Sequence, residues 1–172
     1  MNTTEAISKV KERFADEIQR EQEFRGELTI EVGLESHKEI LAYLNSLGFA
    51  VLMDLTGVDY LHPFAHTQVI YWLHNPKSYA RLRVFVSVGR EQPLRSVADI
   101  WRGANWYERE LFDLFGVEFI GHPDFKRILM PDNWQGHPLR KDYALTEESV
   151  EFKHGVKPKV PSQIIPYAKD DH

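Results

Sequence analysis

The stretch from Trp106 to Tyr143 constrains this sequence more than any other, because it starts with helical periodicity and then loses it. Four apolar residues of its first part recur at i, i+4, i+7 and i+8, which places them on one face of a helix. They are Tyr107, Leu111, Leu114 and Phe115. Gly116 predicts the end of that helix, because glycine readily takes the left-handed conformation common at helix C-termini. The chain must therefore bury one helix face and then continue in another form.

Polar residues on this helix are spaced for local contacts. Asn105 at the N-cap and Glu108 three residues later match a capping box. Arg109 and Asp113 lie i, i+4 apart and are expected to form an ion pair. A guanidinium beside Glu108, Glu110 and Asp113 would keep these carboxylates ionised, which argues against acid–base catalysis. We therefore interpret the cluster as a structural or interfacial ion-pair network.

Beyond the helix the sequence stays apolar but is no longer periodic. Two Gly-His-Pro triplets, at 121–123 and 136–138, favour extended geometry because each proline restricts the residue before it. Large apolar residues lie between the triplets, namely Phe125, Ile128, Leu129, Met130 and Trp134. Charged residues are interleaved with them. Such a segment is too apolar for a solvated loop and needs a surface to lie against.

Three motifs in this stretch resemble one protein family. They are E-R-E-x-x-D-L-F-G from Glu108 to Gly116, G-H-P-D-F-K-R-I-L from Gly121 to Leu129, and W-x-G-H-P-L-R-K-D-Y from Trp134 to Tyr143. Together they are similar to the signature of the C subunits of NADH:quinone oxidoreductase (respiratory complex I), the 30-kilodalton-subunit family. The chain departs from the family pattern at Ala144, where a proline is usual.

The resemblance implies a non-catalytic structural subunit of the peripheral arm of complex I. On that basis the chain binds the D-type and B-type subunits of the connecting module. The whole complex couples NADH oxidation and quinone reduction to proton translocation. This chain is expected to bind no cofactor itself, since other subunits hold NADH, FMN, iron–sulfur clusters and quinone. Its expected place is peripheral, at the cytoplasmic face of the inner (plasma) membrane.

The same stretch is predicted to form the partner interface. Trp, Tyr and Arg are enriched in interface hot spots, and arginine forks bind carboxylates bidentately. Arg140 is accordingly expected to pair with a buried carboxylate of a partner. The predicted interface residues are Glu108, Arg109, Asp113, His122, Arg127, Trp134, His137, Arg140, Asp142 and Tyr143. The alternative is that this segment folds back over its own domain.

Two other functions stay open at this point. The first is the equivalent subunit of a related membrane-bound hydrogenase or another quinone-linked dehydrogenase. The second is a stand-alone metal-dependent hydrolase, since His122, Asp124, His137 and Asp142 are all metal-ligand types. No pair among them has the helical His spacing of a zincin, and each histidine precedes a proline. We therefore interpret both imidazoles as hydrogen-bonding anchors rather than metal ligands.

Composition excludes several classes of function. Because the chain has no cysteine, disulfides, thiolate nucleophiles and thiolate-bound iron–sulfur clusters are ruled out. The formal net charge of −5 argues against nucleic acid as the main partner. No P-loop, dinucleotide fingerprint or nucleophile elbow occurs, and no apolar run approaches the ~20 residues of a membrane span. The N-terminus lacks the apolar region of a signal peptide, so we expect an intracellular protein, soluble or held at a membrane through partners.

Residues 1–116 predict an α+β domain, with helices on one face of a mixed, largely antiparallel sheet. Helices are expected over residues 4–22, from the Ser36–Glu39 capping box to Gly48, and over 97–101. Strands are expected over residues 27–32, 49–60, 67–74 and 80–88, the last three as an antiparallel meander. Gly57 predicts a bulge or a close backbone approach. Asp54 and Asp59 beside it are interpreted as turn or cap residues.

Residues 117–172 are predicted to form an extended partner-binding segment and tail. From Ala144 the sequence is rich in charge and proline and cannot bury enough surface to order itself alone. Ile164, Ile165 and Tyr167 form a small apolar group near the end. They are expected either to dock on a partner or to belong to a disordered end.

Overall fold

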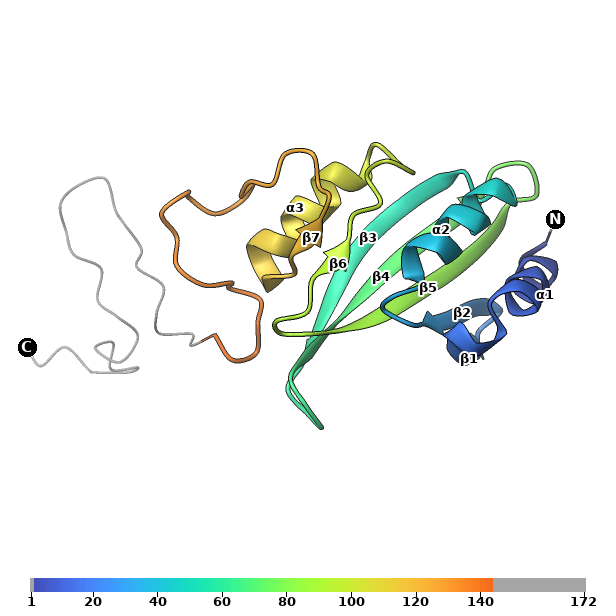
Figure 1. Cartoon of the computed structure of the whole chain (residues 1–172), viewed down its shortest axis with the longest axis horizontal. Helices are drawn as coiled ribbons and strands as arrows, with labels where there is room; N and C mark the ends of the chain where they lie inside the picture. Colours follow the sequence, from blue (N-terminus) through green and yellow to red (C-terminus); the bar gives the residue numbers. More distant parts are fainter. Residues whose placement is uncertain (1, 144–172) are drawn as a thin grey trace, which may run out of the picture.

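The fold is built on a five-stranded sheet, seen in a computed structural model that describes residues 2–143 (Figure 1). The strands lie in the order β1-β2-β5-β4-β3. Their bounds are β1 Ile18–Phe24, β2 Glu27–Val32, β3 Val51–Tyr60, β4 His66–Asn75 and β5 Ala80–Gly89. The helices are α1 Thr3–Arg13, α2 His37–Ser46 and α3 Ala104–Phe115. The α+β prediction is thus confirmed, while the predictions for residues 144–172 lie outside the described residues.

Alternation along the strands determines how the sheet is built. β3, β4 and β5 pair antiparallel in sequence order, as the predicted meander requires. The α2 crossover carries the chain from β2 to β3 at the far edge of the sheet, and the β3–β4 and β4–β5 hairpins then bring β5 back beside β2 in parallel. Only this pair is parallel among the five strands, so the sheet is mixed and largely antiparallel.

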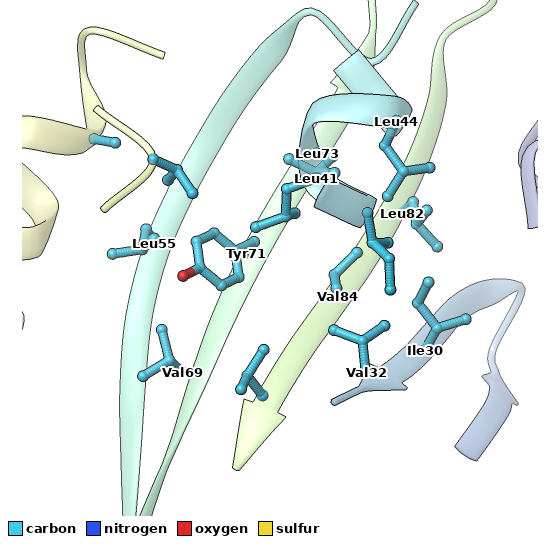
Figure 2. Close-up of a cluster of buried hydrophobic side chains, with 14 of the residues drawn as sticks. Ile30, Val32, Leu41, Leu44, Leu55, Val69, Tyr71, Leu73, Leu82 and Val84 are labelled. Carbon is cyan, nitrogen blue, oxygen red and sulfur yellow. The ribbon is translucent and has the colours of Figure 1, made fainter. Parts of the chain in front are cut away.

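One face of the sheet buries the core. Along β5, Leu82, Val84, Val86 and Val88 are buried, whereas the residues between them are less so. Figure 2 shows Leu55, Val69 and Tyr71 of β3 and β4 in one cluster with Leu41 and Leu44 of α2. Ala6, Ile7 and Val10 of α1 complete it. Helices and apolar side chains therefore share one face, as predicted.

The predicted helix over residues 4–22 is wrong in its second half. Helix α1 ends at Arg13, and β1 begins at Ile18 as an antiparallel partner of β2. Arg25 and Gly26 both have positive φ, 52° and 79°, which is the geometry of a two-residue hairpin turn. The hydrogen bonds of this hairpin outweigh the helical preference of a charged segment. The N-cap is Asn2, with Glu5 closing a capping box.

Two other local predictions are also corrected. Ser36 makes no capping hydrogen bond, because its hydroxyl donates to Glu17 Oε2 at 2.6 Å, and Glu39 instead binds Arg95. Residues 97–101 form hydrogen-bonded turns rather than a helix. Distant partners compete successfully with the local pairings that spacing suggested.

A second, small sheet joins the segment after α3 to the domain. β6 (Leu94–Arg95) pairs in parallel with β7 (Phe119–Ile120), and Val117 and Phe119 are buried in the core. Residues 117–120 therefore pack with the domain rather than standing apart from it. No helix in the described part of the chain is long and apolar enough to cross a membrane.

Candidate partner-binding site

Helix α3 lies against β3 and presents the signature residues. Leu111 and Phe115 reach the backbone at Gly57, where an added Cβ would stand 2.7 Å from Leu111 Cδ2. The predicted close approach at Gly57 is thus confirmed. Gly116 ends the helix with φ 75°, as predicted, but the N-cap is Gly103 and not Asn105.

Glu108 is fully buried and does not cap its helix. Its carboxylate accepts hydrogen bonds from Ser96 Oγ and from the Val97 backbone N–H, both at 2.7 Å. It thereby fastens the turn that precedes the helix. Burial raises the pKa of Glu108 to about 7, against the lowering effect of these two donors. The prediction that a neighbouring arginine keeps this group fully ionised is therefore wrong.

Arg109 does not pair with Asp113. Its Nε donates to the carbonyl of Lys126 at 3.0 Å, and its Nη2 donates to the carbonyl of Arg127 at 3.3 Å. The guanidinium also lies over the Trp106 ring, 4.9 Å from its centroid. Arg109 thus holds the residues that follow the helix, which we call the ribbon (residues 117–143).

Asp113 is the main anchor of the ribbon. Its Oδ2 accepts the backbone N–H groups of Ile128, Leu129 and Met130 at 3.0, 2.7 and 2.8 Å. Its Oδ1 accepts Arg127 Nη1 at 2.6 Å. Burial alone would raise the pKa of Asp113, but these donors outweigh it and lower the pKa below its usual value. One carboxylate therefore replaces the regular hydrogen bonds that the non-periodic ribbon lacks.

Both histidines of the Gly-His-Pro triplets act as hydrogen-bonding anchors, as predicted. His122 Nε2 donates to the Asn105 carbonyl at 3.0 Å, and its Nδ1 accepts the Asp124 N–H at 3.1 Å. His137 Nδ1 donates to the Asp113 carbonyl at 3.0 Å. An added Cβ at Gly116 would come within 2.6 Å of His137 Cδ2, so this imidazole covers the end of α3.

Residues outside the signature anchor the far end of the ribbon. Asp59 is buried, forms a bidentate ion pair with Arg90 and accepts the Lys141 N–H at 2.7 Å. Burial raises the pKa of Asp59, but Arg90 and the Lys141 N–H outweigh it and leave the pKa lowered. The turn or cap role predicted for Asp59 is wrong. A usable signal existed, because alternation with Leu55 and Gly57 puts Asp59 on the core face.

The remaining predicted residues lie nearer the surface. Arg140 binds Asp142 of this same chain through Nε and Nη2, both at 3.1 Å, so its bidentate carboxylate is intramolecular. Tyr143 packs on Gly136, where an added Cβ would stand 2.7 Å from its ring. Trp134 is half-buried, and its indole N–H finds no acceptor among the described residues.

The polar signature residues thus mostly bind their own chain, while apolar residues face outward. Glu108 and Asp113 are fully buried and reach no surface. The exposed large apolar side chains of α3 and the ribbon are Trp106, Ile120, Phe125, Leu129 and Leu139. Within residues 2–143 no group of three or more His, Asp or Glu side chains is arranged to hold a metal ion. The arrangement suits a rigid recognition surface.

Comparison with known proteins identifies the family. The family model described as "Respiratory-chain NADH dehydrogenase, 30 Kd subunit" matches residues 30–149. The C subunit of the NADH-quinone oxidoreductase of Geobacter sulfurreducens is 44% identical over 143 residues, covering 81% of this chain and 88% of that protein. The corresponding C subunit of Roseiflexus sp. (strain RS-1) is 38% identical, covering 88% and 90%.

Two solved structures share the fold. The trypsin-resistant fragment (1-134) of Nqo5 is 35% identical, with a TM-score of 0.61, and the match covers 69% of this chain and 98% of the fragment. A chain of the membrane-bound sulfane sulfur reductase, an archaeal respiratory membrane complex, has a TM-score of 0.72 at 22% identity, covering 83% and 85%. By sequence and by fold, this chain belongs to the family of the 30-kilodalton subunit of respiratory-chain NADH dehydrogenase.

Proposed function

We propose that this chain is a non-catalytic structural subunit in the peripheral arm of an NADH:quinone oxidoreductase. Its partners are the D-type and B-type subunits, and its place is the cytoplasmic face of the inner (plasma) membrane. The chain binds no cofactor, and NADH, FMN, iron–sulfur clusters and quinone belong to other subunits. Its relatives among the C subunits of NADH-quinone oxidoreductases support this assignment.

One observation carries the proposal. The ribbon is irregular, yet Asp113, Arg109 and Asp59 hold it in one conformation with apolar side chains outward. A segment ordered before binding loses less conformational entropy on association, so its exposed apolar side chains contribute more of their burial to affinity. The signature residues on this view shape the interface, and Leu129 and Leu139 contact the partner.

Binding of the remaining complex tests the proposal. The full chain is added to the parent complex prepared without it, and the dissociation constant is measured. The double variant Leu129→Ser/Leu139→Ser is expected to bind at least about tenfold more weakly. Tyr79→Ser, which changes an exposed aromatic residue at the β4–β5 turn, is the control and is expected to stay within about twofold. Equal binding by both variants would refute the ribbon as the interface.

A second measurement addresses catalysis. Complexes assembled with His122→Gln or His137→Gln are expected to turn over NADH at the wild-type rate per assembled complex. A loss of turnover in fully assembled complex would show that these imidazoles act in the chemistry. Identifying the electron donor that the native complex oxidises separates complex I from a related membrane-bound hydrogenase or quinone-linked dehydrogenase.

A further inference from the structure

The turn between β3 and β4 is unusually apolar for an exposed connection. Residues 60–66 contain no Asp, Glu, Lys or Arg, and the exposed side chains include Tyr60, Leu61 and Phe64. Turns more commonly use Gly, Asn, Asp and Ser, which stay hydrated. In Figure 1 this hairpin projects beyond the rest of the sheet at the lower end of the view. We call residues 60–66 the hairpin tip.

The hairpin tip is ordered by its own aromatic contacts. The ring of His66 stacks on Tyr60 with centroids 5.1 Å apart and lies 4.8 Å from the ring of Phe64. His66 Nδ1 donates to the Phe64 carbonyl at 2.9 Å, which closes the turn from inside. The apolar side chains are therefore presented on a preformed frame, which lowers the entropic cost of binding.

The base of the hairpin is joined to the ribbon. Asp59, the residue before the tip, accepts hydrogen bonds from Thr67 Oγ1 on β4 and from the Lys141 N–H of the ribbon. Arg90 binds Asp59 and also lies 3.5 Å from Asp142. The hairpin tip thus continues the surface formed by the end of the ribbon, and one partner surface could span both.

We propose that the hairpin tip is a second docking element, which inserts into an apolar pocket on a neighbouring protein of the assembly. This inference rests on the proposed function, since it requires that the chain is part of an assembly. A projecting apolar element fits a concave pocket, and aromatic anchors in such pockets dominate interface energies. An anionic membrane surface is a poorer match, because the tip carries no Lys or Arg and the chain has a formal net charge of −5.

Two exposed phenylalanines provide a matched test. Phe64 in the hairpin tip is 63% exposed and Phe24 on edge strand β1 is 61% exposed. The full chain is bound to the complex that lacks it. Phe64→Ser is expected to weaken this binding about tenfold or more, and Phe24→Ser less than about twofold. Both variants should melt at the wild-type temperature, because neither side chain is buried. Equal binding by the two variants overturns the inference.

A crosslink identifies what the tip contacts. A photo-crosslinking phenylalanine analogue placed at Leu61 in the assembled complex is expected to give an adduct with another protein of the complex. Wild-type flotation with phosphatidylglycerol vesicles that Phe64→Ser abolishes would overturn the inference, as would a Leu61 adduct with a second copy of this chain. If the wild-type chain fails to bind the complex at all, the proposed function fails. If it binds and Phe64→Ser binds equally well, the hairpin inference alone fails.

Discussion

The sheet and the ribbon of this protein are held in different ways. The sheet depends on many buried aliphatic side chains spread over β2 to β5 and the three helices α1, α2 and α3. Beyond β7, residues 121–143 of the ribbon add nothing to this core and depend on a few polar anchors, above all Asp113 and Asp59. An apolar core spreads its stabilising free energy over many side chains and tolerates the change of one of them. A buried carboxylate with several donors concentrates the stabilising free energy of its network at one residue. Ribbon order should therefore fail abruptly when a single anchor is lost.

The largest effect is expected from Asp113→Ala. It leaves three backbone N–H groups and the Arg127 guanidinium without their acceptor, and removing one partner of a buried charged network costs about 3–5 kcal/mol. Amide hydrogen exchange at Leu129 and Met130 should accelerate strongly, while exchange in β4 and β5 changes little. Asp132→Ala, an exposed ribbon residue, is the control. Unchanged protection at Leu129 in Asp113→Ala would contradict the anchor role.

Leu41→Ala tests the other side of the comparison. Leu41 is fully buried between α2 and the sheet, and truncating such a leucine costs about 2–5 kcal/mol through lost burial and a residual cavity. Denaturant unfolding should show a lower midpoint at all probes together, because the core stabilises the whole domain. If Leu41→Ala instead left the denaturant midpoint unchanged and only accelerated amide exchange in the ribbon, Leu41 would not stabilise the whole domain and the contrast between sheet and ribbon would be wrong.

Glu108 gives a pH-dependent distinction. Its folded pKa of about 7 lies above the ordinary value of 4.5, so the folded state binds the proton more tightly than the unfolded state. Stability from this group is present at pH 4.5 and below and is lost as pH rises to about 7, by about 3 kcal/mol.

The measurement compares wild type with Glu108→Gln between about pH 5 and pH 8, the window in which the shifted group titrates. Glutamine keeps the shape and can still bond Ser96 and the Val97 N–H, but it does not titrate. The free energy of unfolding of wild type should fall relative to that of the variant as pH rises. Parallel pH profiles for the two proteins would argue that Glu108 has an ordinary pKa.

The smallest effect is expected for Arg140→Ala in the isolated chain. Its partner Asp142 is substantially exposed, and exposed ion pairs contribute about 0–1 kcal/mol. Thermal unfolding should therefore barely change. A loss as large as that of Asp113→Ala would place Arg140 among the anchors and remove the contrast between surface pairs and buried ones.

The elements with clear periodicity could be predicted from the sequence. The alternation along β5 and the apolar stripe of α2 indicate which face of each element is buried. The sheet and the helices on one of its faces could therefore be predicted. β1 was missed because it is an exposed edge strand with no alternation to detect. Its signal was the Arg25-Gly26 turn, which is shorter than any periodic window.

The signature residues lie on α3 and on the segment after it, as predicted, but their hydrogen bonds differ from the predicted ones. Spacing suggested that Glu108 caps α3 and that Arg109 pairs with Asp113, because both contacts are the nearest ones along a helix. In the folded chain Glu108 accepts a hydrogen bond from Ser96, and Asp113 accepts hydrogen bonds from the ribbon. Buried carboxylates favour such partners because each of their oxygens then has a hydrogen-bond donor. Whether the ribbon contacts a partner stays a prediction.

The contact between Gly116 and His137 also constrains how this sequence can change. The His137 imidazole lies where the Cβ of any side chain at position 116 would be. Whether a substitution at one of these positions fits therefore depends on the residue at the other. A bulkier residue at 116 becomes acceptable only after the ring has been replaced by something smaller, and the positive φ of 75° still penalises it. The residue tolerated at the end of α3 and the position of the second Gly-His-Pro triplet are in this way set together.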